Sequence, residues 1–220
     1  NKFKTSTNNE NVFANYNVFA KNQMILNIGA YDSIELSDIT NKYNTWIYDL
    51  FDDEISNRLL NAYKNNEMND ELIDTIHNKF SFYLPIDENF HLIHNKKDFI
   101  WFGRGYPYRW ITIHRLSGNI DSDNFANLYK ELIKKTMKDV TIVDQYIKFE
   151  YKEKILIIRG LYEHGHSDSG GPFFTYIVKN NTNNELTFVS GFVNNPGKSK
   201  YYLLKQLESI INLNIKDILK

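Results

Sequence analysis

The sequence contains no cysteine, which excludes disulfide bonds, cysteine-ligated zinc and cysteine nucleophiles among its 220 residues. It also lacks any apolar run near the roughly 20 residues that a membrane-spanning helix needs. Neither sign of charge dominates, because the chain has 26 basic and 27 acidic residues and a formal net charge of −1. That balance gives no electrostatic reason to expect nucleic acid or an anionic membrane surface as a partner.

Apolar and aromatic side chains, in contrast, are abundant. Hydrophobic residues make up 42% of the chain, which includes 15 phenylalanines and 15 tyrosines. Disordered chains are poor in aromatic residues, so we expect folded domains with a sizeable core. The chain opens Asn1-Lys2-Phe3-Lys4, without a methionine or a signal-peptide pattern. We therefore expect a mature or truncated product, with any targeting segment lying upstream.

Residues 1–80 predict a small β-β-α-α unit. Two strands are expected over residues 12–20 and 23–30, and Asp32 offers a helix cap after them. Apolar side chains then recur at spacings of three and four from Tyr43 to Tyr63, which indicates a helix. A second, short helix follows around residue 73. We expect these two helices to form a core-facing hairpin, although the aromatic stripe of the first could instead bind a partner.

Residues 81–220 predict the main domain. Strands are expected over residues 80–85, 99–102, 109–114, 145–151, 154–162, 173–179 and 185–193, with helices over 123–137 and 199–212. The short connections between consecutive strands are typical of hairpins, so the strands should form an antiparallel sheet with helices covering a face. The predicted fold class is therefore α+β, an antiparallel β-sheet packed with helices and preceded by the smaller unit.

One segment resembles a catalytic motif. Ser167-Asp168-Ser169-Gly170-Gly171-Pro172 differs by one residue from the nucleophile motif of chymotrypsin-like proteases. That chemistry also needs a histidine base and an orienting carboxylate, and no histidine precedes His77, which lies in a helical pattern. We favour a structural turn in which Gly170 or Gly171 has a positive φ and Pro172 starts the next strand. A serine hydrolase using Ser169 stays open as an alternative.

Two pairs of histidines have a spacing that could ligate a metal ion. His164 and His166 lie beside Asp168, and His91 and His94 form a similar pair. Such spacing can direct two imidazoles to one side of a strand. The glycine and serine residues around His164 favour a loop with solvated side chains instead. We therefore expect no metal site and no cofactor.

An aromatic and basic cluster lies near a predicted hairpin turn and is the best candidate for a binding surface. It consists of Arg104, Tyr106, Tyr108, Arg109 and Trp110. These side chains could stack on a sugar, a base or a peptide. The alternative is that surface aromatics and arginine stems simply pack over a sheet edge.

Several segments of the second half resemble a known family. They are Ile157-Ile158-Arg159-Gly160-Leu161-Tyr162-Glu163, Gly170-Gly171-Pro172-Phe173 with Tyr176, and Gly191-Phe192-Val193 with Pro196-Gly197-Lys198. Together they are similar to the cell-envelope lipoproteins of Bacteroidota grouped as the domain of unknown function 4837 family. The resemblance is strongest over residues 150–210. It implies a longer N-terminus with a signal peptide and a lipidated cysteine, and it implies no catalytic residue.

These observations lead to one expectation with two alternatives. We expect a non-enzymatic lipoprotein domain of the cell envelope, in the periplasm or at the outer membrane, that binds another envelope protein or a glycan. Contact with the membrane would come through the upstream lipid anchor. The alternatives are a serine hydrolase using Ser169, and a glycan or small-ligand binding module using the surface from Tyr106 to Trp110.

Overall fold

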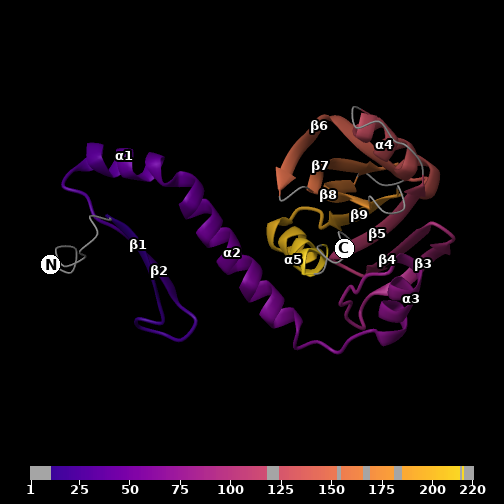
Figure 1. Cartoon of the computed structure of the whole chain (residues 1–220), viewed down its shortest axis with the longest axis horizontal. Helices are drawn as coiled ribbons and strands as arrows, with labels where there is room; N and C mark the ends of the chain where they lie inside the picture. Colours follow the sequence, from indigo (N-terminus) through magenta and orange to yellow (C-terminus); the bar gives the residue numbers. More distant parts are fainter. Residues whose placement is uncertain are drawn as a thin grey trace. The chain divides into compact units, whose positions relative to one another are not determined.

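The computed structural model describes residues 11–117, 124–152, 155–165, 169–180, 185–213 and 215. The chain divides between Glu54 and Ile55 into two compact units, called unit 1 and unit 2 below. Figure 1 shows the course of the chain through both. The sequence predicts the boundary between the N-terminal unit and the main domain later in the chain, after residue 80.

Unit 1 contains a β-hairpin followed by helix. Strands β1 (Val12–Tyr16) and β2 (Met24–Ile28) pair antiparallel, which confirms the two predicted strands in shorter form. Helix α1 (Ser33–Lys42) was not predicted as a separate helix. It begins at the expected cap, because Asp32 Oδ1 accepts the N–H groups of Ile34 and Glu35 at 2.9 and 2.8 Å. Helix α2 (Asn44–Tyr63) then runs from unit 1 into unit 2.

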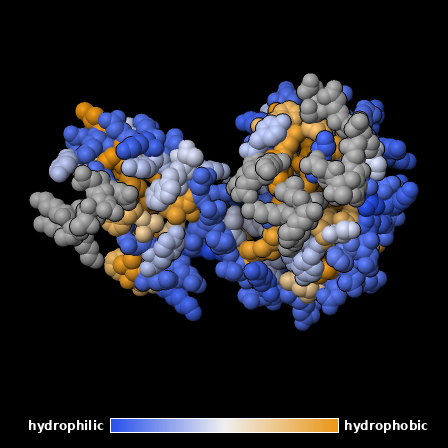
Figure 2. Space-filling view, in the orientation of Figure 1, coloured by the Kyte–Doolittle hydropathy of each residue, from blue (hydrophilic) through white to orange (hydrophobic). Residues whose placement is uncertain are grey.

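Many apolar side chains of residues 11–63 lie at the surface (Figure 2). Phe19 and Tyr31 are almost fully exposed, and Trp46 and Phe51 on α2 are each 43% exposed. Among the residues of α2, Tyr63 alone is buried. The apolar stripe of α2 is therefore less buried than the predicted core-facing hairpin requires.

Unit 2 is built on a seven-stranded sheet in which every neighbouring pair of strands is antiparallel. Its strands are β3 (His91–Lys96), β4 (Phe99–Arg104), β5 (Tyr108–Ser117), β6 (Val140–Lys152), β7 (Ile155–His164), β8 (Ser169–Asn180) and β9 (Glu185–Asn194). They lie in the order β3-β4-β5-β9-β8-β7-β6. The antiparallel sheet with its helices confirms the predicted α+β class.

Helices cover both faces of this sheet, whereas the sequence predicted one covered face. Helices α3 (Asp70–Phe80) and α5 (Tyr201–Asn212) share a hydrophobic core with one face, and α4 (Phe125–Thr136) shares a second core with the other (Figure 1). We call these the α5 face and the α4 face. Helix α3, which the sequence analysis assigned to the N-terminal unit, therefore packs in unit 2.

The strand residues alternate between the two faces. In β7, Ile155 and Ile157 belong to the core on the α5 face, whereas Leu156 and Ile158 belong to the core on the α4 face. A sheet covered on both sides needs apolar residues at consecutive positions, which is what this strand has.

The predicted strand over residues 80–85 is wrong. Phe80 ends α3, and Ser81 follows in the left-handed region with a φ of 62°. Phe82, Leu84 and Ile86 are buried in an irregular segment, so their alternation reflects burial and not strand pairing. Strand β3 was missed because its side chains are exposed along its whole length, which leaves no apolar alternation to detect.

Candidate functional site

The five predicted binding residues lie on the β4–β5 hairpin, but they divide between the two faces of the sheet. Trp110 packs against the core of the α4 face. Arg109, its neighbour, donates a hydrogen bond from Nη1 to Gln206 Oε1 of α5. Arg104 is the cross-strand partner of Arg109 and therefore shares the α5 face. The predicted cluster is thus two separate groups of side chains.

On the α4 face, five rings form a continuous row that we call the aromatic strip. It consists of Tyr106, Tyr108, Trp110, Trp101 and His94, with successive ring centroids 6.0, 6.4, 5.9 and 5.5 Å apart. The strip crosses from the β4–β5 turn over β5 and β4 to the edge strand β3. Tyr106 is 58% exposed and Tyr108 is 44% exposed, whereas both tryptophans are half-buried. Ring faces at one end of the strip are therefore open to solvent.

A glycine on the neighbouring strand makes room for the strip. A Cβ atom on Gly103 would lie 2.4 Å from Cδ1 of Trp110, closer than any side chain can come. Trp110 also contacts the rings of Tyr162 and His164, whose centroids lie 5.9 and 6.4 Å away. Trp110, in the middle of the strip, is therefore held by packing from several strands.

Near the two tryptophans of the strip lie polar atoms with unmet hydrogen-bonding capacity. Asn194 is the cross-strand partner of Tyr108, and its Nδ2 donates to Ser169 Oγ at 3.1 Å. Asn194 Oδ1, Trp101 Nε1 and Tyr162 Oη are buried without a hydrogen-bond partner within the described ranges. Burial raises the pKa of Tyr162. Buried polar atoms are normally paired, so these atoms keep unused hydrogen-bonding capacity.

Ser169 begins strand β8 and is the cross-strand partner of His164. Cross-strand partners lie on the same face, so Ser169 shares the α4 face with Trp110 and Asn194. His166, Ser167 and Asp168 lie outside the described residues. The structure thus places His164 directly across from Ser169 in the β7–β8 register, on the same face of the sheet.

The predicted turn at Gly170, Gly171 and Pro172 is wrong. All three residues lie in β8 and pair with β7. Neither glycine has a positive φ, whereas Gly197 has one, at 69°. A Cβ atom would lie 2.2 Å from Tyr162 O at Gly170 and 1.9 Å from Val193 O at Gly171. The glycines are needed because neighbouring backbones approach too closely for a side chain.

The histidine pairs give no metal centre in the described parts of the chain. His91 and His94 lie on the exposed edge strand β3, and His94 packs against Trp101. No group of three or more histidine, aspartate or glutamate side chains that could hold a metal ion occurs among the residues that were described. No helix among them is long and apolar enough to cross a membrane.

Sequence reasoning missed Trp101, Tyr162 and Asn194 as parts of the site. They come from β4, β7 and β9, and strand pairing alone brings them beside Trp110. One signal was available for Asn194, because asparagine is uncommon in strands and two asparagines stand together at the end of this one.

The family model described as a domain of unknown function, DUF4837, matches residues 69–213. The chain belongs to this family. The match confirms the family named from the sequence. It begins at the N-cap of α3 and ends after α5, so it covers the whole seven-stranded sheet. No curated protein shows significant sequence similarity to the chain.

Solved structures resemble the chain only distantly. A crystal structure from Bacteroides thetaiotaomicron VPI-5482 has a TM-score of 0.35 and 11% identity over 59% of this chain and 43% of its own. A mutant of the protein Mog1 has a TM-score of 0.39 and 6% identity over 60% of this chain and 89% of its own. The chain thus spans less than half of the first structure, and neither likeness indicates a function.

Proposed function

We propose that this chain is a non-enzymatic binding domain of a cell-envelope lipoprotein and that the aromatic strip contacts its envelope partner. The observation that carries the proposal is the row of ring faces that opens to solvent at Tyr106 and Tyr108. The envelope location and the lipid anchor are supported by membership of the family that the sequence resembles.

Exposed tyrosines suit a binding surface for a physical reason. Tyrosine and tryptophan offer a large contact area with few rotatable bonds, so little conformational entropy is lost when they bind. Here the outer rings are already held by neighbours, because Tyr106 and Tyr108 pack edge to face and Lys198 Nζ lies 5.8 Å from the Tyr106 ring centroid. The surface is therefore largely formed before a partner arrives.

The polar atoms near the two tryptophans of the strip favour a glycan as that partner. A sugar presents an apolar ring face that stacks on aromatic rings and hydroxyl groups that both donate and accept. A rearrangement that exposed Asn194 Oδ1 and Trp101 Nε1, which are buried in the unbound protein, would let them accept from and donate to such hydroxyl groups. A purely apolar partner would leave both atoms unsatisfied.

A binding assay with matched tyrosine variants tests the proposal. Tyr106→Ala and Tyr108→Ala should each weaken co-sedimentation with purified envelope glycan by about tenfold, as loss of a stacking ring does. Tyr83→Ala is the control, because Tyr83 is an exposed tyrosine (47%) that lies outside the strip. It follows α3, whose last turn contacts Arg115, and Arg115 lies at the opposite end of β5 from Tyr108. Equal binding by all of these proteins would refute a role for the strip.

A serine hydrolase is the second candidate, because His164 lies opposite Ser169 in the β7–β8 register. An active serine would react with a fluorophosphonate probe. Our proposal predicts that the wild-type protein stays unlabelled. Stoichiometric labelling that disappears in Ser169→Ala would establish the hydrolase instead.

A further inference from the structure

Two arginines face each other across the β4–β5 hairpin. Arg104 and Arg109 are cross-strand partners on the α5 face, an arrangement in which like charges repel. Arg104 is compensated, because its Nη1 lies 3.2 Å from Oδ2 of the fully buried Asp87. Asp87 also accepts from Asn66 Nδ2 at 3.1 Å and from the N–H of Asn89 at 3.0 Å. Its carboxylate is thus already occupied by several donors.

Arg109 makes no ion pair of its own among the described residues, although the charge of Asp87 acts on it from a distance. It is 7% exposed, and its Nη1 donates to the neutral side chain of Gln206. Its Nε is buried without a hydrogen-bond partner in the described part of the chain. Burial, followed by the nearby charge of Arg104, lowers the pKa of Arg109 to about 10, so the side chain is still charged at neutral pH. Burying a charge without a partner is costly.

The other arginines on this face show what Arg109 lacks. Arg115 lies on the same strand and the same face, where its Nη2 is 3.6 Å from Asp98 Oδ1 and its Nη1 donates to Lys79 O. Arg159 forms ion pairs with Glu208 and Glu150. Arg109 is therefore set apart by its neutral partner and its unpaired Nε.

We propose that Arg109 and Arg104 form a binding site for an oxyanion, carried by the ligand as a carboxylate or a phosphate group. Both groups have the negative charge and the paired oxygens that a guanidinium binds through Nε and a neighbouring nitrogen. A bound oxyanion would give Arg109 a directly hydrogen-bonded counter-charge and would reduce the repulsion between the two arginines.

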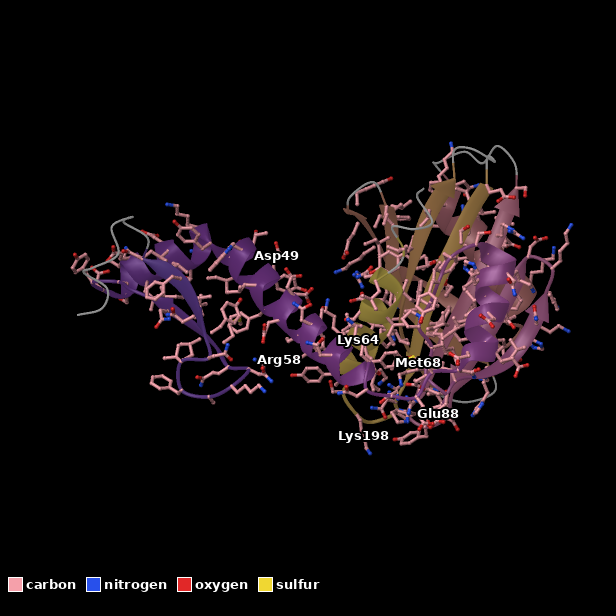
Figure 3. The ribbon with its side chains drawn as sticks, turned by 60° about the horizontal axis from the view of Figure 1, so that its bottom comes forward. Asp49, Arg58, Lys64, Met68, Glu88 and Lys198 are labelled. Carbon is pink, nitrogen blue, oxygen red and sulfur yellow. The ribbon has the colours of Figure 1, made fainter. Side chains whose placement is uncertain are left out.

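The surroundings of the pair suit an anionic ligand. The side chain of Arg104 is 23% exposed, so the site reaches the surface at the end of β4. Figure 3 shows Lys64, Met68, Glu88 and Lys198 at this end of unit 2, where Met68 forms a β-bridge with Asp87. Arg104 and Arg109 lie on the face opposite the aromatic strip, so the site uses none of the rings that carry the function proposed above.

Thermal unfolding at constant ionic strength tests the site. Sodium phosphate and sodium acetate, each compared with sodium chloride, should raise the midpoint of the wild-type protein saturably. Arg109→Gln should weaken the apparent affinity by at least about tenfold, because a charge-assisted pair is lost. Arg115→Gln is the matched control and should respond like the wild type. Equal responses of the wild type and Arg109→Gln would overturn the proposal.

A second measurement does not depend on the stability of that variant. The side-chain Nε–Hε resonance of Arg109 in the wild-type protein, assigned with Arg109→Lys, should shift saturably during titration with phosphate or acetate. Whichever anion saturates at the lower concentration identifies the oxyanion group. A resonance that stays unchanged with both anions would contradict the site, whatever the variant does.

Discussion

On the α5 face of the sheet a buried carboxylate is held in ion pairs, whereas on the α4 face a group of buried neutral side chains share hydrogen bonds. Glu208 of α5 binds Arg159 and lies 3.2 Å from Lys205 Nζ. On the other face, Tyr129 of α4 donates to Ser190, and Ser190 donates to Thr175, both at 2.9 Å. One sheet thus carries two different solutions to the burial of polar groups.

The difference follows from access to water. Arg159 is 30% exposed and has an outer partner, Glu150, that is half exposed, so its charge is partly solvated. Tyr129, Ser190 and Thr175 are fully buried or nearly so. A neutral hydroxyl chain satisfies its members without water, whereas a buried charge needs a partner of opposite sign. The two faces should therefore respond differently to charge removal, to pH and to loss of a hydroxyl group.

Removal of the buried carboxylate on the α5 face should have the largest effect. Glu208→Gln leaves Arg159 with its exposed partner alone, and we expect the free energy of unfolding to fall by about 3 kcal/mol. Glu150→Gln removes the half-exposed partner of the same arginine and should cost less than about 1 kcal/mol. Urea unfolding of both variants measures the difference. Equal losses would show that burial does not distinguish the two pairs.

Acid should destabilise the α4 face through His114. Burial lowers the pKa of His114 to about 3, and its ring stacks on Phe99 and bonds Thr136. A histidine with a lowered pKa is neutral in the fold and takes up a proton on unfolding below its usual pKa of about 6.5. The stability it contributes is present above that pH and is lost as pH falls. We expect about 2 kcal/mol less stability at pH 5 than at pH 7.

The variant His114→Phe isolates this effect. It keeps the ring stack with Phe99 but cannot titrate, so the difference in unfolding free energy between pH 5 and pH 7 should shrink by the same amount. Chemical denaturation at several pH values gives the measurement. An unchanged difference in the variant would assign the pH dependence to other groups.

Loss of one hydroxyl group from the neutral chain should cost less. Tyr129→Phe removes the donor to Ser190 while it keeps the ring that stacks on Phe173 and Phe188. We expect the free energy of unfolding to fall by about 1 kcal/mol, the value of a typical buried hydrogen bond. Thermal unfolding would detect this change, and a loss near that of Glu208→Gln would erase the contrast between the faces.

The sequence predicted most elements of the fold for a clear reason. Strands and helices of unit 2 bury alternating or periodic apolar side chains, as in β7 and α5, and those patterns are visible in the chain. The same rule explains the errors. Strand β3 buries nothing, so it was missed, whereas the irregular segment around Leu84 is buried and was taken for a strand.

The site was harder to predict, because it depends on which strands pair. The five clustered residues are adjacent in the chain, but consecutive strand residues face opposite ways, so Arg109 and Trp110 separate. Tyr162 and Asn194 join Trp110 through the order of β7, β8 and β9, which local patterns do not specify. Gly170 and Gly171 were recognised as required glycines, but the requirement is backbone crowding between strands and not a positive φ.

The smallest expected effect concerns a hydroxyl group outside the neutral chain. Thr112 is fully buried, and its Oγ1 has no hydrogen-bond partner in the part of the chain that the structure describes. Valine has nearly the same shape and a high strand propensity, so Thr112→Val removes an unpaired polar atom without a cavity. We expect stability to stay unchanged or to rise by up to about 1 kcal/mol.

In Thr175→Val the same change removes an acceptor of Ser190, and stability should fall by about 1 kcal/mol. In urea unfolding, Thr112→Val should therefore show no loss of stability, whereas Thr175→Val should show a clear one. A clear loss in Thr112→Val would mean that its hydroxyl group is hydrogen-bonded, and the neutral chain would then extend across the sheet to β5.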